Sequence, residues 1–132
     1  DVAKAMAMGA DAVSIGSAAM MALNCNADLY VEDYKKLGTE PGYCHHCHTG
    51  KCPVGVATQD PELEKRLNPI EAGKRIKNYL TTLTLELQTL ARANGKSDVR
   101  NLEPEDLAAL TVEAAAMARV PLAGTDWIPG KK

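Results

Sequence analysis

Three of the four cysteines in this chain of 132 residues lie in one short stretch, at Cys44, Cys47 and Cys52. Thiolates separated by two and then by four residues can point inward from a single tight loop, and such soft ligands select zinc, copper(I) or an iron–sulfur cluster. Three histidines, a lysine and two glycines lie within or directly after this stretch, which suits a metal loop better than cysteines buried as small apolar groups. A metal centre is therefore the first hypothesis. Zinc competes with a cluster because histidine and cysteine mix freely in zinc sites, and the spacing alone does not exclude a redox disulfide.

The same stretch resembles a known family signature. Residues 47–61 read CHTGKCPVGVATQDP and are similar to the cluster-binding pattern of the FMN-containing synthase domain of glutamate synthase. The resemblance implies that Cys47 and Cys52 are two ligands of a 3Fe-4S cluster. The family's first ligand follows a helix that ends as residues 22–25 do here, which indicates Cys25. This chain carries many more residues before Cys47, however, and adds Cys44. The third ligand is thus Cys25 or Cys44, and a 4Fe-4S cluster becomes possible if all four cysteines bind.

The first residues predict one unit of an α/β fold. The pattern is a helix over residues 2–8 closed by Gly9, a short buried strand over residues 12–15, and a turn at Gly16 and Ser17 that opens another helix. In α/β barrels such a turn presents backbone N–H groups to a phosphate, and glycine lets the anion approach closely. An ordinary tight turn is the alternative explanation of the same residues.

The family resemblance extends to this unit, because residues 9–18 are similar to the phosphate loop after the eighth strand of the synthase domain, an FMN-binding (β/α)8 barrel. It implies that Gly16 and Ser17 bind FMN. It also implies an α/β fold class, the C-terminal part of a (β/α)8 TIM barrel with an iron–sulfur loop and a helical C-terminal extension. The expected parts are residues 1–24, the last helix and strand of the barrel; residues 25–60, the cysteine-rich loop with an insertion; and residues 61–132, the extension.

Helices are expected beyond the loop. Residues 60–61 and 68–69 each place proline directly after an N-cap residue, so each pair marks a helix start. The second helix should be long and end at residues 94–95. Its apolar stripe consists of Ile76, Leu80, Leu83, Leu87 and Leu90. Shorter helices are expected to start within residues 101–107 and 111–113, and the polar segment 26–42 is interpreted as a surface insertion.

Composition bounds the class of protein. The 15 basic and 17 acidic residues leave a net charge of −2, which gives no basic footprint for nucleic acid. No run of about twenty apolar residues predicts a membrane span, and the first segment lacks the order of a signal peptide. We expect a cytoplasmic protein, because four cysteines kept for a metal suit a reducing compartment. The chain starts at Asp1 without methionine and is expected to be the C-terminal piece of a larger protein.

The resemblance also implies an activity. A glutamate synthase-type oxidoreductase adds ammonia or an amine to 2-oxoglutarate and reduces the imine to glutamate with FMN, while the cluster passes single electrons to the flavin. Residues 102–110 and 120–124 look like the end of stand-alone synthase subunits, including the methylglutamate synthase (methylamine–glutamate N-methyltransferase) type, which is the alternative activity. The implied partners are the rest of the barrel and separate glutamine amidotransferase and glycine-rich β-helix subunits.

A hypothesis from another class is a zinc-stapled structural or interaction domain without redox activity. Catalytic residues are not assigned, because the earlier strand ends of a barrel would supply most of them.

Overall fold

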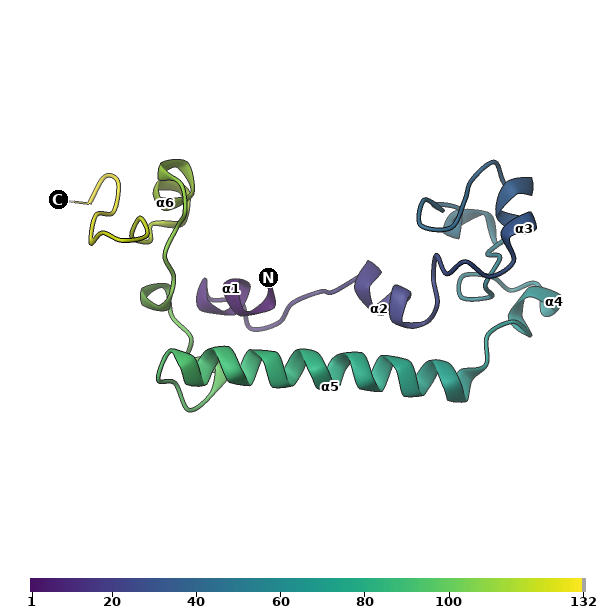
Figure 1. Ribbon diagram of the computed structural model, residues 1–132, viewed down its shortest axis with the longest axis horizontal. Helices are drawn as coiled ribbons and strands as arrows, with labels where there is room; N and C mark the ends of the chain where they lie inside the picture. The colour runs from purple at the N-terminus through teal and green to yellow at the C-terminus, as the bar shows by residue number, and fades with distance from the viewer. Residues whose placement is uncertain (132) are drawn as a thin grey trace. The chain divides into compact units, whose positions relative to one another are not determined.

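The computed structural model describes residues 1–131, which form helices joined by turns and extended connections (Figure 1). The α-helices are α1 (Val2–Ala7), α2 (Ser17–Ala22), α3 (Val31–Lys36), α4 (Pro61–Glu64), α5 (Pro69–Ala93) and α6 (Val112–Ala118). Three short 3-10 turns are η1 (Cys47–Thr49), η2 (Val99–Asn101) and η3 (Pro104–Asp106). The chain divides into two compact units, one of residues 15–82 and the other of residues 1–14 with the part from residue 83 onward.

The strand predicted over residues 12–15 is not formed. This segment is an extended connection between α1 and α2, and the β pairing recorded for the described residues is an isolated parallel bridge between Ala109 and Leu122. A parallel strand gains its hydrogen bonds from neighbouring strands, and the chain as described supplies none beside this segment. The α/β barrel therefore stays a prediction.

The unit that contains both ends of the chain has two small apolar cores. In the first, Ala7 of α1 packs with Ala91 at the end of α5 and with Leu102, so α1 lies along the last turns of α5 (Figure 1). In the second, Ala109, Ala115 and Val120 pack together. The predicted first helix is confirmed, and it ends where Gly9 takes a left-handed conformation with φ of +98°.

The unit of residues 15–82 holds α2, α3, α4, the cysteine stretch and the first part of α5. Both predicted helix starts are confirmed here. The Asp60 side chain accepts hydrogen bonds from the N–H groups of Glu62 at 2.8 Å and Leu63 at 3.2 Å, and the Asn68 side chain caps the first turn of α5 in the same way. In the same unit, Arg75 Nε of α5 donates a hydrogen bond to the carbonyl of Ala22 at 3.2 Å, and this bond fastens α2 to α5.

The long helix α5 has the predicted length, but its apolar stripe is only partly covered. Ile76, Leu83 and Leu87 are half-buried, whereas Leu80 and Leu90 are exposed. The fully buried positions are the small residues Ala72 and Ala91, which allow close approach of neighbouring segments. The buried face of α5 is therefore rotated slightly about the helix axis from the apolar stripe that the sequence predicted.

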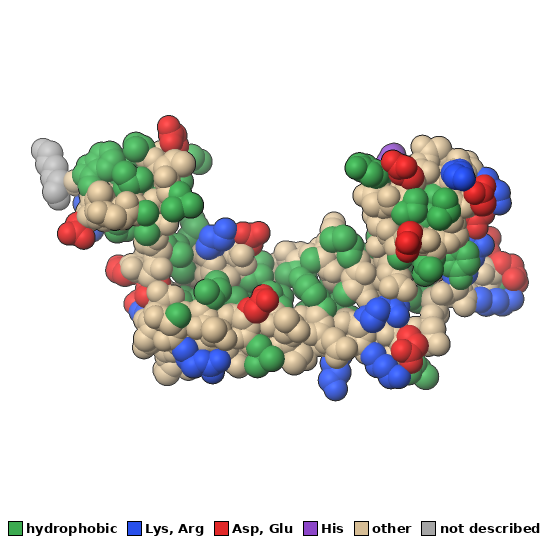
Figure 2. Space-filling model, in the orientation of Figure 1, with side chains coloured by type: hydrophobic (Ala, Val, Ile, Leu, Met, Phe, Trp, Pro, Cys, Tyr) green, Lys and Arg blue, Asp and Glu red, His purple; other side chains and the backbone are tan. Residues whose placement is uncertain are grey.

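On the face of the protein drawn in Figure 2, acidic and basic side chains are interspersed, with apolar side chains between them. None of the helices within residues 1–131 is both long enough and apolar enough to cross a membrane.

Candidate metal centre

Two separate turns carry the four cysteines. Cys25 follows α2 and lies between Asn24 and Asn26, which both have positive φ, so the chain turns tightly on each side of it. The other three lie in the stretch from Cys44 to Cys52, where Cys47 begins η1 and Gly50 closes it with φ of +72°. All four are free thiols, with Cys52 buried, Cys25 and Cys44 half-buried, and Cys47 exposed.

The Asn26 side chain ties these two turns together. Its Oδ1 accepts a hydrogen bond from the N–H of Cys44 at 2.9 Å, and its Nδ2 donates to the carbonyl of Cys44 at 3.5 Å. Because the Asn26 side chain binds both polar groups of the Cys44 backbone, the turn that contains Cys25 is held beside Cys44. Cys44 lies 19 residues beyond Cys25 along the chain. The two ends of the segment between Asn26 and Cys44 are therefore bound to each other.

Tyr34 of α3 forms the centre of the small apolar core under the cysteines. It packs with Cys52 and Val54, and partly buried Cys44, Val56 and Ala57 cover this group. The segment interpreted from sequence as a surface insertion therefore sends one aromatic side chain inward, while Glu32, Lys35 and Lys36 of the same helix stay exposed. The interpretation is right for these three charged residues, but it missed the buried Tyr34 and the partly buried Asp33.

Arg66 fastens α3 to the cysteine stretch from the other side. Its Nη1 lies 2.8 Å from Asp33 Oδ2 and donates to the carbonyl of Pro53 at 2.8 Å. Its guanidinium also stacks over the Tyr30 ring, with Cζ 4.2 Å from the ring centroid. Hydrogen bonds from Lys36 and then from Arg66 lower the pKa of Asp33 below its usual value, so the carboxylate stays charged and the clamp stays closed at neutral pH.

Gly55 lets the end of the cysteine stretch approach the helical segment that follows. It has φ of +78°, and a Cβ at this position would collide with the carbonyl of Leu63 and lie 3.1 Å from the nitrogen of Leu67. Glycine is required here both for the backbone conformation and for the close contact. The contact explains why Cys52, Pro53 and Val54 are buried although they belong to a loop.

The charges of the other three cysteines act on the thiol of Cys25. Burial raises the pKa of Cys25, and the negative charges of Cys47, Cys52 and Cys44 raise it further, in that order of size. The pKa of Tyr34 is raised to about 12, first by burial and then by the charges of Cys44, Cys52 and Cys25. Cys25 therefore lies near enough to the other three predicted ligands, Cys44, Cys47 and Cys52, for their charges to act on it, and Tyr34 lies near Cys25, Cys44 and Cys52.

The donor set of this site fits a group that takes soft ligands. Four thiols repel one another as thiolates, and a bound cation would relieve that repulsion and favour their deprotonated state. In residues 1–131, no three His, Cys, Asp or Glu side chains stand close enough together to hold a single metal ion. The histidines stack instead, with the rings of His45 and His46 4.6 Å apart and those of His46 and His48 6.3 Å apart.

The predicted phosphate turn lies in the same unit. Gly16 precedes α2 with φ of +38°, a conformation that favours glycine, and both Gly16 and Ser17 are exposed. No side chain caps this end of α2. The helix has six residues, so its dipole is short and the backbone N–H groups of the turn would carry most of the attraction for an anion.

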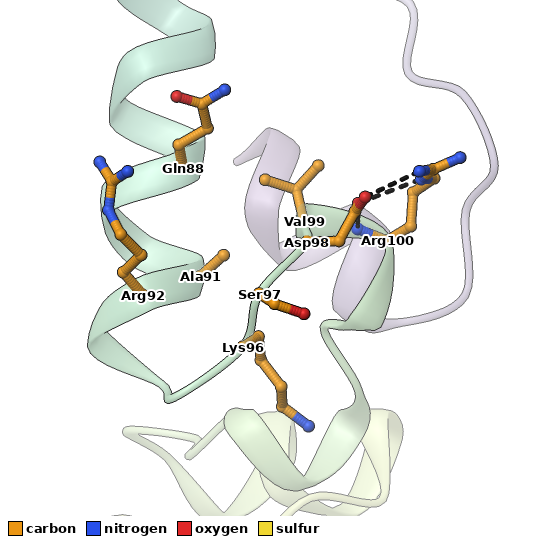
Figure 3. A pocket seen from close by; sticks show the side chains of 8 residues that line it. All are labelled: Gln88, Ala91, Arg92, Lys96, Ser97, Asp98, Val99 and Arg100. Carbon is orange, nitrogen blue, oxygen red and sulfur yellow. Dashed lines mark hydrogen bonds and ion pairs between the residues drawn. The ribbon is translucent and has the colours of Figure 1, made fainter.

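A pocket of about 470 Å³ lies in the other unit, between the end of α5 and η2 (Figure 3). Its basic residues Lys96 and Arg100 are already paired. Lys96 Nζ lies 2.7 Å from Glu103 and 3.4 Å from Asp106, and Arg100 lies 2.7 Å from Asp98. These pairs neutralise two of the three basic residues that line the pocket, the third being Arg92, and no further observation points to a ligand, so we assign this pocket no chemistry.

Sequence reasoning missed three residues that build the metal site, namely Asn26, Tyr34 and Arg66. A signal existed for Tyr34, because it is the apolar residue in the middle of a short charged helix. Asn26 and Arg66 act across 18 and 33 residues of sequence, and no local pattern predicts such contacts.

Comparison with known proteins supplies an independent line of argument. The family model described as a conserved region in glutamate synthase matches residues 1–97. A glutamate synthase large subunit-like protein of Rhizobium meliloti is 62% identical over 131 residues, which is 99% of this chain and 30% of that protein. An archaeal glutamate synthase (NADPH) of Methanocaldococcus jannaschii is 41% identical over 102 residues, which is 77% of this chain and 17% of that protein. No solved structure matches significantly.

Proposed function

This chain belongs to the glutamate synthase family of enzymes, and from that premise we propose that it carries the iron–sulfur site and part of the flavin site of a glutamate synthase-type oxidoreductase. The chain spans about a third or less of the length of these relatives, 30% of the first and 17% of the second, so the activity belongs to a larger assembly of which this chain is one part. When bound, FMN supplies hydride transfer and an iron–sulfur cluster supplies single-electron transfer.

The two hydrogen bonds between the Asn26 side chain and the Cys44 backbone carry this proposal, because they hold the turn that contains Cys25 to the stretch that contains the other three cysteines. The charges of Cys47, Cys52 and Cys44, which raise the pKa of Cys25 after its burial, are consistent with this arrangement. We propose Cys47 and Cys52 as two ligands and Cys25 or Cys44 as the third, giving a 3Fe-4S cluster. A 4Fe-4S cluster results if all four bind. The tie between Asn26 and Cys44 supports the presence of both candidates at the site.

For the flavin, we propose that Gly16 and Ser17 bind the phosphate of FMN through their backbone N–H groups. The positive φ of Gly16 and the exposure of the turn support this assignment. The proposal includes the remainder of a (β/α)8 barrel, because residues 12–15 need neighbouring strands. The division into a barrel end over residues 1–24, a cluster loop over residues 25–60 and a helical extension over residues 61–132 belongs to the same proposal.

The proposed substrates are 2-oxoglutarate and an amine, with glutamate as product, and the proposed partners are a glutamine amidotransferase and a glycine-rich β-helix subunit. Synthesis of N-methylglutamate from methylamine is the second candidate. The relative of 62% identity is named a glutamate synthase large subunit-like protein, a name that supports the family and favours neither amine donor. A reducing, cytoplasmic compartment would suit four free cysteines.

The test uses the full-length protein purified without oxygen. We expect broad visible absorption beyond the protein band, with iron and acid-labile sulfide present in similar amounts. Cys47→Ser and Cys52→Ser should abolish these signals, because a hydroxyl is a poor substitute for a soft thiolate. Separate Cys25→Ser and Cys44→Ser variants identify the third ligand by the larger loss of iron.

The matched control is His48→Ala, which removes the exposed neighbour of Cys47 and should leave the iron content unchanged. A colourless protein that carries zinc, and that loses it in the histidine variant, would replace the cluster proposal with a zinc-stapled domain.

A further inference from the structure

The hydroxyl of Tyr34 is a buried polar group without a partner. Tyr34 is 1% exposed, and its hydroxyl has no hydrogen-bond partner within the described residues. A buried hydroxyl that makes no hydrogen bond costs free energy, so proteins retain one only where something outside the polypeptide satisfies it or where function needs it. Phenylalanine would fill the same volume without that cost.

The surroundings of this hydroxyl indicate what satisfies it. Tyr34 packs against Cys52 and Cys44, and the charges of Cys44, Cys52 and Cys25 all act on its phenol. None of these sulfurs accepts a hydrogen bond from the hydroxyl. An acceptor held by these cysteines would lie near the hydroxyl, and a phenol O–H is a hydrogen-bond donor.

The position of Tyr34 is fixed from outside the cysteine stretch. Its neighbour Asp33 is bound by Arg66, which also holds the carbonyl of Pro53 next to Cys52. The helix α3 and the cysteine stretch are therefore held in one arrangement by a side chain that belongs to neither. A donor fixed in this way keeps its direction when the charge of its acceptor changes.

We infer that the Tyr34 hydroxyl donates a hydrogen bond to a sulfur of the cluster that the surrounding cysteines hold, and that it thereby raises the reduction potential of that cluster. Tyr34 is a positioning and tuning residue, and the inference rests on the proposed function, because it requires an iron–sulfur group. A hydrogen bond to sulfur stabilises the reduced form more than the oxidised form, since the reduced cluster carries one more negative charge.

The experiment compares Tyr34→Phe with Tyr30→Phe in the full-length, cluster-loaded protein. Tyr30 lies four residues before Tyr34 and is 44% exposed, and Tyr30→Phe keeps the ring on which Arg66 stacks, so this variant removes only an exposed phenol hydroxyl. A redox titration followed by electron paramagnetic resonance should give a more negative potential for Tyr34→Phe alone. We expect the equilibrium constant for one-electron reduction to fall about tenfold, which is about 59 mV for one electron. The coupling of the cluster to a solvent-exchangeable proton should weaken in the same variant.

Iron and sulfide analysis separates failure of this inference from failure of the proposed function. Full cluster content with the same potential in wild type and Tyr34→Phe would overturn the hydrogen bond and leave the proposed function standing. Absence of iron and sulfide from the wild type would overturn both. If Tyr34→Phe does not retain its cluster, 3-fluorotyrosine at position 34 keeps the ring and makes a stronger donor. Its potential should then be higher than that of the wild type, and an unchanged potential would overturn the inference.

Discussion

The guanidinium of Arg66 lies 2.8 Å from the carboxylate of Asp33, and the two side chains are only 25% and 29% exposed. The pair joins the segment after α4 to α3 across 33 residues of sequence. Because the same nitrogen of Arg66 binds the carbonyl of Pro53, the pair also fixes the residue next to Cys52. Partly buried, hydrogen-bonded ion pairs of this kind hold geometry better than exposed pairs do.

Replacement of Arg66 should therefore loosen the metal site. We expect Arg66→Gln to release bound metal to a chelator roughly fivefold faster than the wild type, because a charged donor that serves two acceptors is lost. The measurement is the rate of loss of visible absorption, or of metal, in the full-length protein. Lys65→Gln is the matched control, since the neighbouring Lys65 pairs with Glu62 entirely at the surface. Equal release rates for the two variants would contradict the clamp.

Gly55 and Gly50 allow conformational strain to be separated from steric collision. Both have positive φ, but a Cβ would collide with the Leu63 carbonyl only at Gly55, whereas it would meet nothing within 4 Å at Gly50. Alanine at either position should cost roughly 1–3 kcal/mol of backbone strain. Gly55→Ala should cost a further 1–3 kcal/mol or so from overpacking. Urea unfolding of the full-length variants measures both values, and a Gly50→Ala variant as unstable as Gly55→Ala would contradict the close contact.

Asp98 predicts a dependence of stability on acid pH. Hydrogen bonds from the Arg100 side chain and then from its backbone N–H lower the pKa of Asp98 from 3.8 to about 2. A carboxyl whose pKa is lower in the folded state contributes stability that is fully present above the ordinary value of 3.8 and is lost as pH falls through about 2. Asp98→Asn should therefore be less stable than the wild type at pH 6, and this gap should close as the pH approaches 2.

The measurement that checks this prediction is the hydrogen-exchange protection of the η2 amides in wild type and Asp98→Asn across this pH range. Asp126→Asn, which removes a carboxylate from an exposed side chain, serves as the control. A gap between wild type and Asp98→Asn that stayed constant from pH 6 to pH 2 would show that the carboxylate charge contributes nothing.

The parts of the fold that short-range chemistry decides were predictable from sequence. Asp60 and Asn68 mark helix starts because their side chains bind N–H groups two and three residues ahead, and both caps are formed. The start of α6 at Thr111 follows the same rule. The strand predicted over residues 12–15 is not formed for a complementary reason, since its hydrogen bonds would have to come from strands elsewhere. A sequence with a strand pattern forms a β-strand only where a neighbouring strand supplies the hydrogen bonds.

The candidate metal site likewise has parts that local sequence predicts and parts that depend on distant segments. Cys44, Cys47 and Cys52 stand out because their spacing is local, and family resemblance indicated Cys25. The groups that position them could not be read from the sequence. Arg66 looks like any charged residue between two helices, and Asn26 looks like any loop asparagine, until the fold brings each to a backbone carbonyl or N–H group from another segment. Burial of Tyr34 likewise depends on Val54 and Cys52, which arrive from beyond the insertion.

The tie between Asn26 and Cys44 has a consequence for variation among related chains. Because this side chain fastens the two ends of the insertion to each other, the length of chain between them can change without moving Cys25 or Cys44. The entropy of closing a loop rises only slowly with length, by about 0.6 kcal/mol for each doubling. Relatives can therefore gain or lose residues between these ends at little thermodynamic cost while they retain all four thiols. A relative that shortens this segment past α3 would keep the four cysteines and lose Tyr34, and the cluster that we propose would then have a different reduction potential.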